Sequence, residues 1–259
     1  MSSMTYDEAA TERLEAVYRG SDVMAQRSFT LGLLDLKPGE RVLDIGSGPG
    51  FLCQEIATRV GPTGKVKGID ISPVMVERSL LRNKQEWIRF EIASATALPE
   101  SSDTYDAVVS TQVLEYVHDI DSACSEAFRV LKPCGRGVFL ATDWESIAWF
   151  SRNPARMKLV LDAFASHCAF TTLPRFFASH LRKAGFRVER IQSFPILNTS
   201  WNEQFYSCQV IPFISAYIRG QALLSDETLN AWEDELRALG TSGDYYFLSN
   251  RVFFEARKL

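Results

Sequence analysis

The segment of the chain with the clearest capacity for chemistry contains three glycines at alternate positions, Gly46, Gly48 and Gly50. Glycine allows positive φ and lets the main chain approach a ligand closely, although a tight turn without a ligand uses glycine in the same way. A dinucleotide loop follows the pattern G-x-G-x-x-G/A, but the third small position here holds the bulky Phe51. Asp44 precedes the loop, where a carboxylate is unsuited to a pyrophosphate but suits a positively charged ligand. The segment therefore favours a ligand other than a dinucleotide.

Alternating strand and helix patterns surround this loop. Short apolar strands separated by helices predict a parallel sheet that is covered on both faces. We expect helices over 5–18, 21–36, 51–60, 119–131, 154–166 and 173–184, and a further one from Pro73. The expected strands are 41–45, 66–70, 87–92, 105–110, 137–142, 186–196 and 245–256, while 202–239 reads as helical pieces broken at Pro212 and Gly220.

Three segments, 1–36, 143–170 and 198–240, lie outside the regular alternation. Ligands of open α/β sheets bind beyond the carboxyl ends of the strands, so helical additions are well placed to cover such a site. We therefore predict an N-terminal helical lid over 1–36 and one α/β domain over 37–259, with substrate-cover insertions at 143–170 and 198–240.

Composition narrows the classes of protein to which the chain can belong. Of its 259 residues 46% are hydrophobic and 23% are charged, which is typical of a globular protein. The formal charge is -4 and no basic block occurs, which disfavours nucleic-acid binding. Five scattered cysteines without a Cys-x-x-Cys pair predict reduced thiols and no metal site. No apolar run reaches the length of about 18 residues that a membrane span needs, and we expect a cytoplasmic protein.

The run from Val42 to Phe51 resembles the first motif of the class I S-adenosylmethionine-dependent methyltransferases of the small-molecule type. The resemblance covers roughly residues 25–145, with Leu98-Pro99 and the run 110–118 in the order of the family. It implies S-adenosylmethionine as the cofactor. It also implies a doubly wound, mainly parallel, seven-stranded Rossmann-like sheet whose last strand is antiparallel.

The resemblance further assigns contacts to the cofactor. The carboxylate of Asp70 would accept both ribose hydroxyls, and Ile71 would pack on the adenine. Ser94 stands where the family usually has the aspartate that binds the adenine amino group. Gln112 would face the methionine part of the cofactor. An arginine fork suits the carboxylate of that methionine part. The implied cofactor-binding residues are Tyr18, Arg27, Asp44, Gly46, Ser47, Gly48, Gly50, Asp70, Ile71, Ser94, Ala95 and Gln112.

The resemblance implies methyl transfer to an oxygen, nitrogen or carbon atom of a small metabolite. Because the methyl group of a sulfonium is already activated, the protein must mainly position the acceptor and exclude water. Asp143 at the end of the fifth strand could orient or deprotonate the acceptor, and Trp144 and Tyr246 could contact it; a capping aspartate and packing aromatics are the alternatives.

Other functions of the same fold stay open at this point. The protein could consume S-adenosylmethionine without transferring methyl, for example by internal cyclisation of the aminobutyryl chain. It could methylate arsenite held by Cys168 and Cys208, or bind the cofactor as a catalytically silent module. The sequence does not define the oligomeric state.

Overall fold

The computed structural model describes residues 8–259, and the chain forms two compact units. The first unit contains the described residues up to Ala25 together with Asp143–Thr171 and Pro195–Asn250. The second contains Gln26–Thr142, Thr172–Phe194 and Arg251–Leu259. Each unit is built from segments that are distant in sequence, so neither is a contiguous domain.

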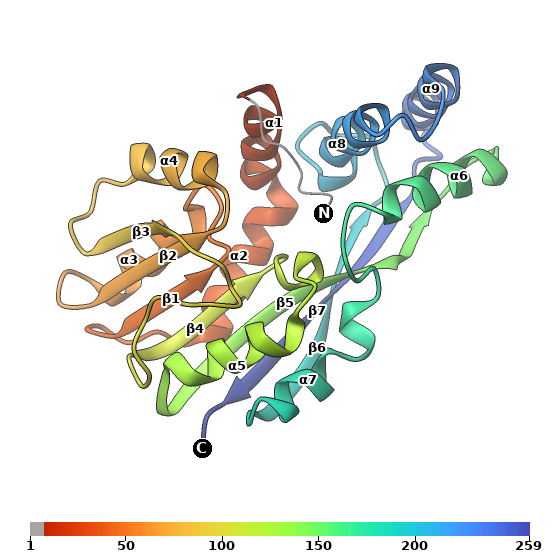
Figure 1. The fold of residues 1–259 in the computed structure, drawn as a ribbon. Coiled ribbons are helices and arrows are strands. Elements are labelled where there is room, and N and C mark those ends of the chain that lie inside the picture. Colours follow the sequence, from red (N-terminus) through yellow and green to blue (C-terminus); the bar gives the residue numbers. More distant parts are fainter. Residues whose placement is uncertain (1–7) are drawn as a thin grey trace. The chain divides into compact units, whose positions relative to one another are not determined.

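Seven strands form one sheet in the order β3-β2-β1-β4-β5-β7-β6 (Figure 1). Neighbouring strands from β3 to β5 are parallel. At the other side, the N–H of Cys134 donates to the carbonyl of Lys258 and the N–H of Lys258 to the carbonyl of Gly135, so β7 runs antiparallel to β5. The predicted sheet is therefore confirmed. The strands are β1 (Arg41–Ile45), β2 (Lys65–Asp70), β3 (Ile88–Ile92), β4 (Tyr105–Thr111), β5 (Leu131–Trp149), β6 (Arg187–Asn198) and β7 (Phe247–Arg257).

Helices of the second unit cover both faces of its strands. Val42 of β1 belongs to the core cluster that contains Ile56 of α3, while Phe139 of β5 packs edge-on against Phe177 of α7. Figure 1 shows α5 beside α7 on one face. Burial of a side chain of this size contributes roughly 1.5–3 kcal/mol. The helices of this unit are α2 (Ser21–Leu34, shared with the first unit), α3 (Phe51–Val60), α4 (Pro73–Arg82), α5 (Ile120–Val130) and α7 (Phe177–Lys183), with short 3₁₀ turns at Leu114–Tyr116 and Leu173–Arg175.

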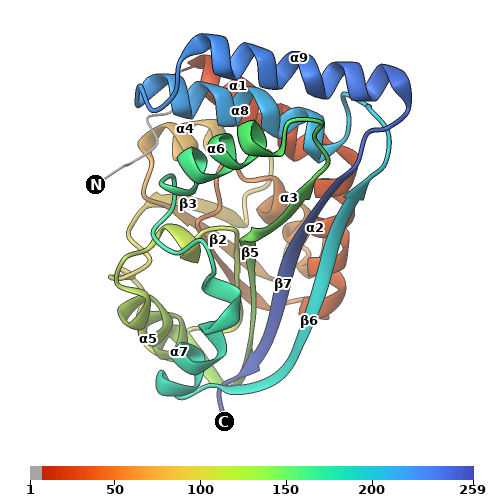
Figure 2. The ribbon, with the colours of Figure 1, turned by 90° about the vertical axis from the view of Figure 1, so that its right-hand side faces the viewer.

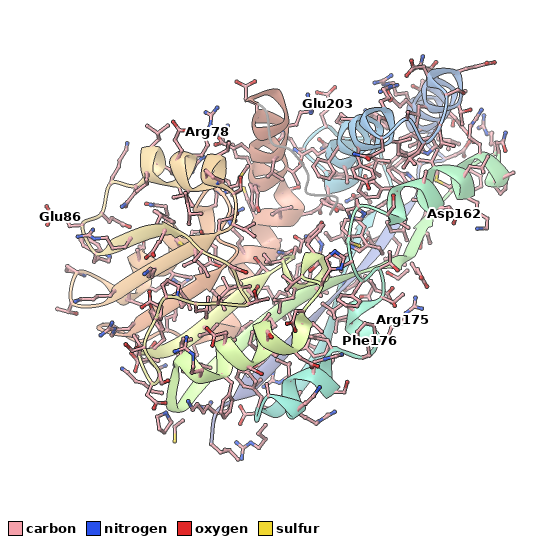
Figure 3. All side chains as sticks on the ribbon, viewed as in Figure 1. Arg78, Glu86, Asp162, Arg175, Phe176 and Glu203 are labelled. Atoms are coloured by element: carbon pink, nitrogen blue, oxygen red, sulfur yellow. The ribbon has the colours of Figure 1, made fainter. Side chains whose placement is uncertain are left out.

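Charged side chains stand on the outside of this layered core. Figure 3 shows Arg78 and Glu86 at the outer edge of the second unit, on α4 and on the loop before β3. On α4 itself Glu77 is exposed, whereas Val76 is buried. The helix is thus amphipathic, as a helix that covers a sheet must be.

The first unit is mainly helical, with α8 in contact with α1, α6 and α9 (Figure 2). The expected break at Pro212 is wrong, because α8 continues through this residue. The predicted break at Gly220 is confirmed, because α8 ends there. Proline costs the helix the bond to the carbonyl of Cys208, but burial of Ile211 and Ile214 compensates for that loss. The helices of this unit are α1 (Glu8–Arg19), α6 (Pro154–Ala165), α8 (Tyr206–Gly220) and α9 (Asp226–Ser242).

Strand β5 is longer than predicted, because residues 143–149 continue it instead of joining the helical addition. The first unit gives this extension its partners. The N–H of Phe150 donates to the carbonyl of Tyr246 over 3.0 Å, and the N–H of Asn250 donates to Ser146 Oγ over 3.0 Å. Pairing with the beginning of β7 thus supplies the hydrogen bonds that local sequence cannot reveal. Among residues 8–259, no helix is long and apolar enough to cross a bilayer.

Candidate functional site

The loop of residues 46–50 joins β1 to α3 and is held by the neighbouring strand. The N–H groups of Gly46 and Ser47 both donate to the carbonyl of Ile69 on β2, each over 2.8 Å. Gly46 has φ +75, and a Cβ atom there would lie 2.2 Å from a methyl carbon of Val113. Gly50 has φ +81, and its Cβ would lie 2.8 Å from the ring of Phe90. Both positions therefore require glycine for conformation and for space.

The carboxylate of Asp70 lies at the tip of β2 and reaches this loop. Its Oδ2 accepts a hydrogen bond from the N–H of Gly48, and its Oδ1 accepts one from the N–H of Ser72, each over 2.9 Å. Burial raises the pKa of the carboxyl above its usual value. A carboxylate oxygen can accept more than one bond, so each oxygen retains capacity for a ligand hydroxyl. The next residue, Ile71, is 74% exposed, which leaves an apolar surface beside this carboxylate.

Asp44 lies beneath the loop and is fully buried. The thiol of Cys53 donates to its Oδ2 over 3.3 Å, and burial raises the pKa of the carboxyl to about 7. Its Oδ1 and the hydroxyl of Ser47 are buried without a hydrogen-bond partner among the described residues. Such groups are costly unless they are satisfied. A glycine cradle with orphaned acceptors below it and a carboxylate beside it fits a ligand that carries hydroxyls and a positive charge.

Phe51, the residue that argues against a dinucleotide, packs against two guanidinium groups. The Cζ of Arg82 lies 3.8 Å from the centre of the ring and that of Arg27 lies 5.3 Å from it. Arg82 Nε also donates to the carbonyl of Pro49 over 2.9 Å, while Arg27 Nε donates to Glu55 over 2.9 Å. The arginines thus brace the beginning of α3. The predicted contact of Arg27 with a ligand carboxylate remains a prediction.

Gln112 directly follows β4 and lies in the left-handed region, with φ +57. Its N–H donates to the carbonyl of Leu140 over 2.8 Å, and its side-chain Nε2 donates to Thr142 Oγ1 over 3.2 Å. The N–H of Thr142 in turn donates to Glu115 Oε1 over 3.3 Å. A non-glycine residue in this conformation stores strain, which is frequent at functional sites. Thr142 of β5 therefore links Gln112 and Glu115 in one hydrogen-bonded network.

Glu115 in that network is completely buried, and burial raises the pKa of its carboxyl to about 7. Arg251, also buried, opposes this rise through its positive charge and donates a hydrogen bond to Gln26. Sequence reasoning assigned no role to Glu115 or to Val113. A charged residue inside the apolar run Val113-Leu114-Glu115-Tyr116-Val117 is the signal that could have identified this buried acid.

Ser94 and Ala95 lie in a turn after β3. The hydroxyl of Ser94 shares a hydrogen bond of 2.8 Å with that of Thr96 and accepts the N–H of Thr96 over 3.2 Å. Ala95 is half-buried. The turn is thus fixed by its own side chains, and the predicted role of both residues at an adenine remains a prediction.

Four other predicted residues lie in the first unit. Tyr18 is half-buried on α1, and Asp143 is half-buried with its carbonyl bonded to Ser146 Oγ over 2.6 Å. The N–H of Trp144 donates to the carbonyl of Thr171 over 2.9 Å. Tyr246 is 40% exposed. Asp143, Trp144 and Tyr246 therefore share one unit, while the glycine loop, Asp70 and Gln112 share the other.

The arsenite alternative depends on cysteine ligands. Residues 8–259 contain no group of three or more His, Cys, Asp or Glu side chains arranged to hold a metal ion. Cys168 is half-buried, and burial raises the pKa of the Cys208 thiol, which disfavours the thiolate that arsenite would require. The arsenite alternative thus gains nothing from the structure.

Comparison with known proteins identifies the family. A family model described as a methyltransferase domain matches residues 36–174, more than half of the chain, and the chain belongs to this family. The resemblance found in the sequence is thereby confirmed. A ubiquinone/menaquinone biosynthesis C-methyltransferase of Bordetella parapertussis is 31% identical over 188 residues, which cover 65% of this chain and 70% of the relative.

Two further comparisons define the extent of the likeness. An uncharacterised 37.1 kDa protein in transposon Tn4556 of Streptomyces fradiae is 34% identical over 151 residues, which cover 57% of this chain but only 44% of that protein. The chain thus spans less than half of the length of this relative. A structure of phosphoethanolamine N-methyltransferase 2 of Haemonchus contortus, in complex with S-adenosyl-L-methionine, has a TM-score of 0.63 at 19% identity, covering 98% of this chain and 58% of that one. This likeness establishes the fold.

Proposed function

We propose that the protein transfers a methyl group from S-adenosylmethionine to a small-molecule acceptor. The observation that supports this proposal is the contact between Asp70 and the glycine loop, which places a carboxylate suited to ribose hydroxyls beside a main-chain cradle. A dinucleotide is disfavoured because Phe51 fills the third small position and is packed against Arg82. Membership of the methyltransferase-domain family supports the same conclusion.

Different residues of the second unit would contact different parts of the cofactor. In this proposal Asp70 accepts the ribose hydroxyls and the exposed Ile71 covers one face of the adenine, with Ser94 and Ala95 at its edge. Gln112 faces the methionine part, and the buried Asp44 lies beneath the loop where a positive charge would be favoured. When bound, the cofactor supplies a methyl group that its sulfonium has already activated.

The carboxylate of the cofactor would be held from the N-terminal helices by Tyr18 and Arg27. An arginine fork suits a carboxylate, and Arg27 lies on the second of these helices, where its Nε donates to Glu55 over 2.9 Å. The proposal therefore predicts that cofactor affinity depends on these helices as well as on the glycine loop.

The acceptor would be handled by the first unit. Asp143 orients or deprotonates it, and Trp144 and Tyr246 contact it. We further propose that residues 1–36, 143–170 and 198–240 act as a cover that excludes water, which suits a small metabolite better than a nucleic acid. A relative named for C-methylation in ubiquinone and menaquinone biosynthesis supports an apolar acceptor.

Calorimetric titration of the purified protein tests the cofactor. We expect S-adenosylmethionine and S-adenosylhomocysteine to bind at a ratio of one to one, and NAD⁺ and FAD not to bind. Tight binding of either dinucleotide in place of S-adenosylmethionine would contradict the proposal.

Mass spectrometry then tests the reaction. With a panel of phenols, amines and hydroquinones, we expect formation of S-adenosylhomocysteine and of a product heavier by one methylene unit, both dependent on the acceptor. Incubation with the cofactor alone is the control. Release of a cyclised aminobutyryl product in that control would favour the enzyme that consumes the cofactor without transferring methyl.

A further inference from the structure

Gln112 lies beside the glycine loop, within the same unit. The hydroxyl of Ser110, near the end of β4, donates to the carbonyl of Ile45, at the end of β1, over 2.9 Å. Val113, the residue after Gln112, meets the loop itself, since a Cβ atom on Gly46 would lie 2.2 Å from a methyl carbon of its side chain. All of these residues belong to the second unit. Gln112 is half-buried, so part of its side chain stays accessible to a ligand at the loop.

The backbone of Gln112 is strained, with φ +57. Glycine adopts such a conformation without the steric cost that a Cβ atom brings. A hydrogen bond of 2.8 Å from the N–H of Gln112 to the carbonyl of Leu140 fixes the strained residue in place. Residues held in this way are frequent at functional sites. The strain therefore points to a use for the amide side chain, which glycine would not provide.

The hydroxyl of Thr142 orients this amide. The Nε2 of Gln112 donates to Thr142 Oγ1 over 3.2 Å, and Thr142 is completely buried. A primary amide carries its donors on the nitrogen and its acceptor on the oxygen. Because the threonine holds the nitrogen, the oxygen Oε1 is presented as an acceptor. Such an oxygen suits an ammonium group, which can only donate.

Thr142 is in turn held by Glu115. The main-chain N–H of Thr142 donates to Glu115 Oε1 over 3.3 Å. Glu115 is completely buried, and its Oε2 has no hydrogen-bond partner among residues 8–259. A buried carboxylate with an unsatisfied oxygen costs stability, which a leucine at the same position would not. Packing alone therefore does not account for a glutamate here.

We propose that Thr142 and Glu115 are positioning residues for the methionine end of S-adenosylmethionine. Glu115 holds the main chain at Thr142, and the hydroxyl of Thr142 holds the amide of Gln112 so that its oxygen accepts a hydrogen bond from the ammonium group of the cofactor. The inference rests on the proposed function, since it concerns the cofactor of that reaction. Neither positioning residue touches the cofactor, so both act through Gln112.

Calorimetry with two related ligands tests this role. S-Adenosylhomocysteine carries the aminobutyrate chain with its ammonium group, whereas 5′-methylthioadenosine has the same adenosine and sulfur but a methyl group in place of that chain. Thr142→Val keeps the shape of the side chain and removes its hydroxyl. We expect it to weaken binding of S-adenosylhomocysteine about fivefold, the effect of one neutral hydrogen bond, and to leave binding of 5′-methylthioadenosine within twofold.

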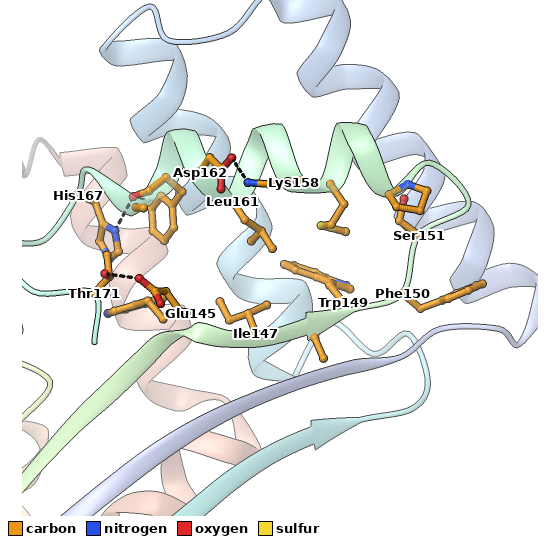
Figure 4. A pocket seen from close by; sticks show the side chains of 16 residues that line it. Glu145, Ile147, Trp149, Phe150, Ser151, Lys158, Leu161, Asp162, His167 and Thr171 are labelled. Atoms are coloured by element: carbon orange, nitrogen blue, oxygen red, sulfur yellow. Dashed lines mark hydrogen bonds and ion pairs between the residues drawn. The ribbon is translucent and has the colours of Figure 1, made fainter. Parts of the chain in front are cut away.

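Two further variants control for the substitution itself. Thr142→Ser restores the hydroxyl and should bind both ligands within twofold of wild type. Thr171→Val removes a threonine hydroxyl that donates to Glu145 over 3.2 Å, on the wall of a pocket between β5 and α6 in the first unit (Figure 4). We expect no change above twofold for either ligand. A loss of S-adenosylhomocysteine affinity in Thr171→Val equal to that in Thr142→Val would overturn the proposal.

A double-mutant cycle tests whether Thr142 acts through Gln112. Gln112→Ala should itself weaken binding of S-adenosylhomocysteine, and Thr142→Val in that background should have no further effect, because the amide that it orients is gone. The same loss in both backgrounds would show that Thr142 acts independently of Gln112 and would contradict the proposal.

Substitutions of Glu115 test the outer part of the network. Glu115→Gln keeps an acceptor for the N–H of Thr142 and should bind S-adenosylhomocysteine within twofold of wild type. Glu115→Leu removes the acceptor, and we expect it to weaken this ligand about as much as Thr142→Val does, with 5′-methylthioadenosine unaffected. Equal affinities of the two variants for S-adenosylhomocysteine would remove Glu115 from the proposal. The Thr142 variants carry the test alone if Glu115→Leu fails to fold.

The same titrations separate this inference from the proposed function. Wild-type protein that binds neither S-adenosylhomocysteine nor 5′-methylthioadenosine would contradict the proposed function itself. Wild-type protein that binds both, with Thr142→Val weakening the two ligands alike or not at all, would overturn the positioning role and leave the proposed function intact.

Discussion

The carboxylate of Asp70 is bonded over 2.9 Å to the N–H of Gly48, 22 residues earlier in the chain. The tip of β2 therefore holds the glycine loop of the neighbouring strand β1. Because the second oxygen of the same carboxylate accepts the N–H of Ser72, its position is fixed from two sides. Any ligand that binds Asp70 must consequently also meet the loop, which couples the sugar contact to the main-chain cradle.

Replacing Asp70 by Ala should weaken S-adenosylmethionine binding by about 1–3 kcal/mol, the cost of losing hydrogen bonds to a charged group. Asp70→Asn keeps one acceptor oxygen and should have a smaller effect. Calorimetric titration measures both changes, and thermal unfolding of each variant without cofactor reports the loss of the Gly48 anchor separately. Wild-type affinity in Asp70→Ala would remove this residue from the site.

Replacing Gly46 by Ala should damage the loop in two ways. The backbone at φ +75 costs an L-residue roughly 1–2 kcal/mol, and the added Cβ would lie 2.2 Å from Val113. Gly61→Ala is the matched control, since Gly61 has φ +68 but no atom within 4 Å of its Cβ position. Chemical denaturation should show a larger loss for Gly46→Ala, and Val113→Ala in the same chain should restore part of it. Equal losses at both glycines would show that the contact with Val113 has no energetic role.

Replacing Arg82 by Ala should weaken cofactor binding without affecting the transfer step. Arg82 braces the loop through the carbonyl of Pro49 and the ring of Phe51, and a cation–π contact contributes about 0.5–2 kcal/mol. We expect KM for S-adenosylmethionine to rise about threefold to tenfold at unchanged kcat, with partial rescue by Arg82→Lys. Lys84→Ala, which removes an exposed cation nearby, is the control. A fall in kcat at unchanged KM would contradict a bracing role.

The sheet and the glycine loop could be predicted because local sequence determines them. The positions of Gly46 and Gly50 demand a sharp turn, and the apolar strands around them demand a buried parallel sheet. The extension of β5 over residues 143–149 could not be predicted in this way, since its hydrogen bonds come from β7, about a hundred residues later. Tertiary pairing of that kind leaves no local pattern.

The electrostatics of the site were the least predictable part. Nothing adjacent to Arg82 in sequence indicates that it would lie over Phe51, because the contact joins the end of α4 to the beginning of α3.

Continuation of α8 through Pro212 could not be predicted either. Local rules assign a helix break to proline, and only burial of one face of the helix offsets the cost of that residue.

Replacing Asp143 by Asn tests its proposed role toward the acceptor. If the carboxylate removes a proton from a hydroxyl or amine, kcat should fall by about 10²-fold for such acceptors, while S-adenosylmethionine binding stays unchanged. Asp234→Asn, at an exposed position on α9, is the control for the loss of one carboxylate. A kcat within twofold of wild type would leave Asp143 with a capping role only.

The buried acid Glu115 makes stability depend on pH. Burial raises the pKa of its carboxyl from 4.5 to about 7, so between these pH values the folded protein retains a proton that the unfolded chain releases. The free energy of unfolding should therefore fall as the pH rises through this window, by an amount on the order of 2–4 kcal/mol, and level off above it. Glu115→Gln removes the titration while keeping an acceptor for the N–H of Thr142.

Urea denaturation at pH 5, 6, 7 and 8 measures this dependence. Asp44, whose pKa burial also raises to about 7, titrates in both proteins, so the difference between wild type and Glu115→Gln isolates Glu115. We expect the variant to gain stability relative to wild type as the pH rises from 5 to 7. Asp44→Asn, measured in parallel, should show a separate change of the same sign. A difference between wild type and Glu115→Gln that does not vary with pH would mean that the carboxyl of Glu115 ionises at its ordinary pKa, and that Arg251 offsets the cost of burial completely.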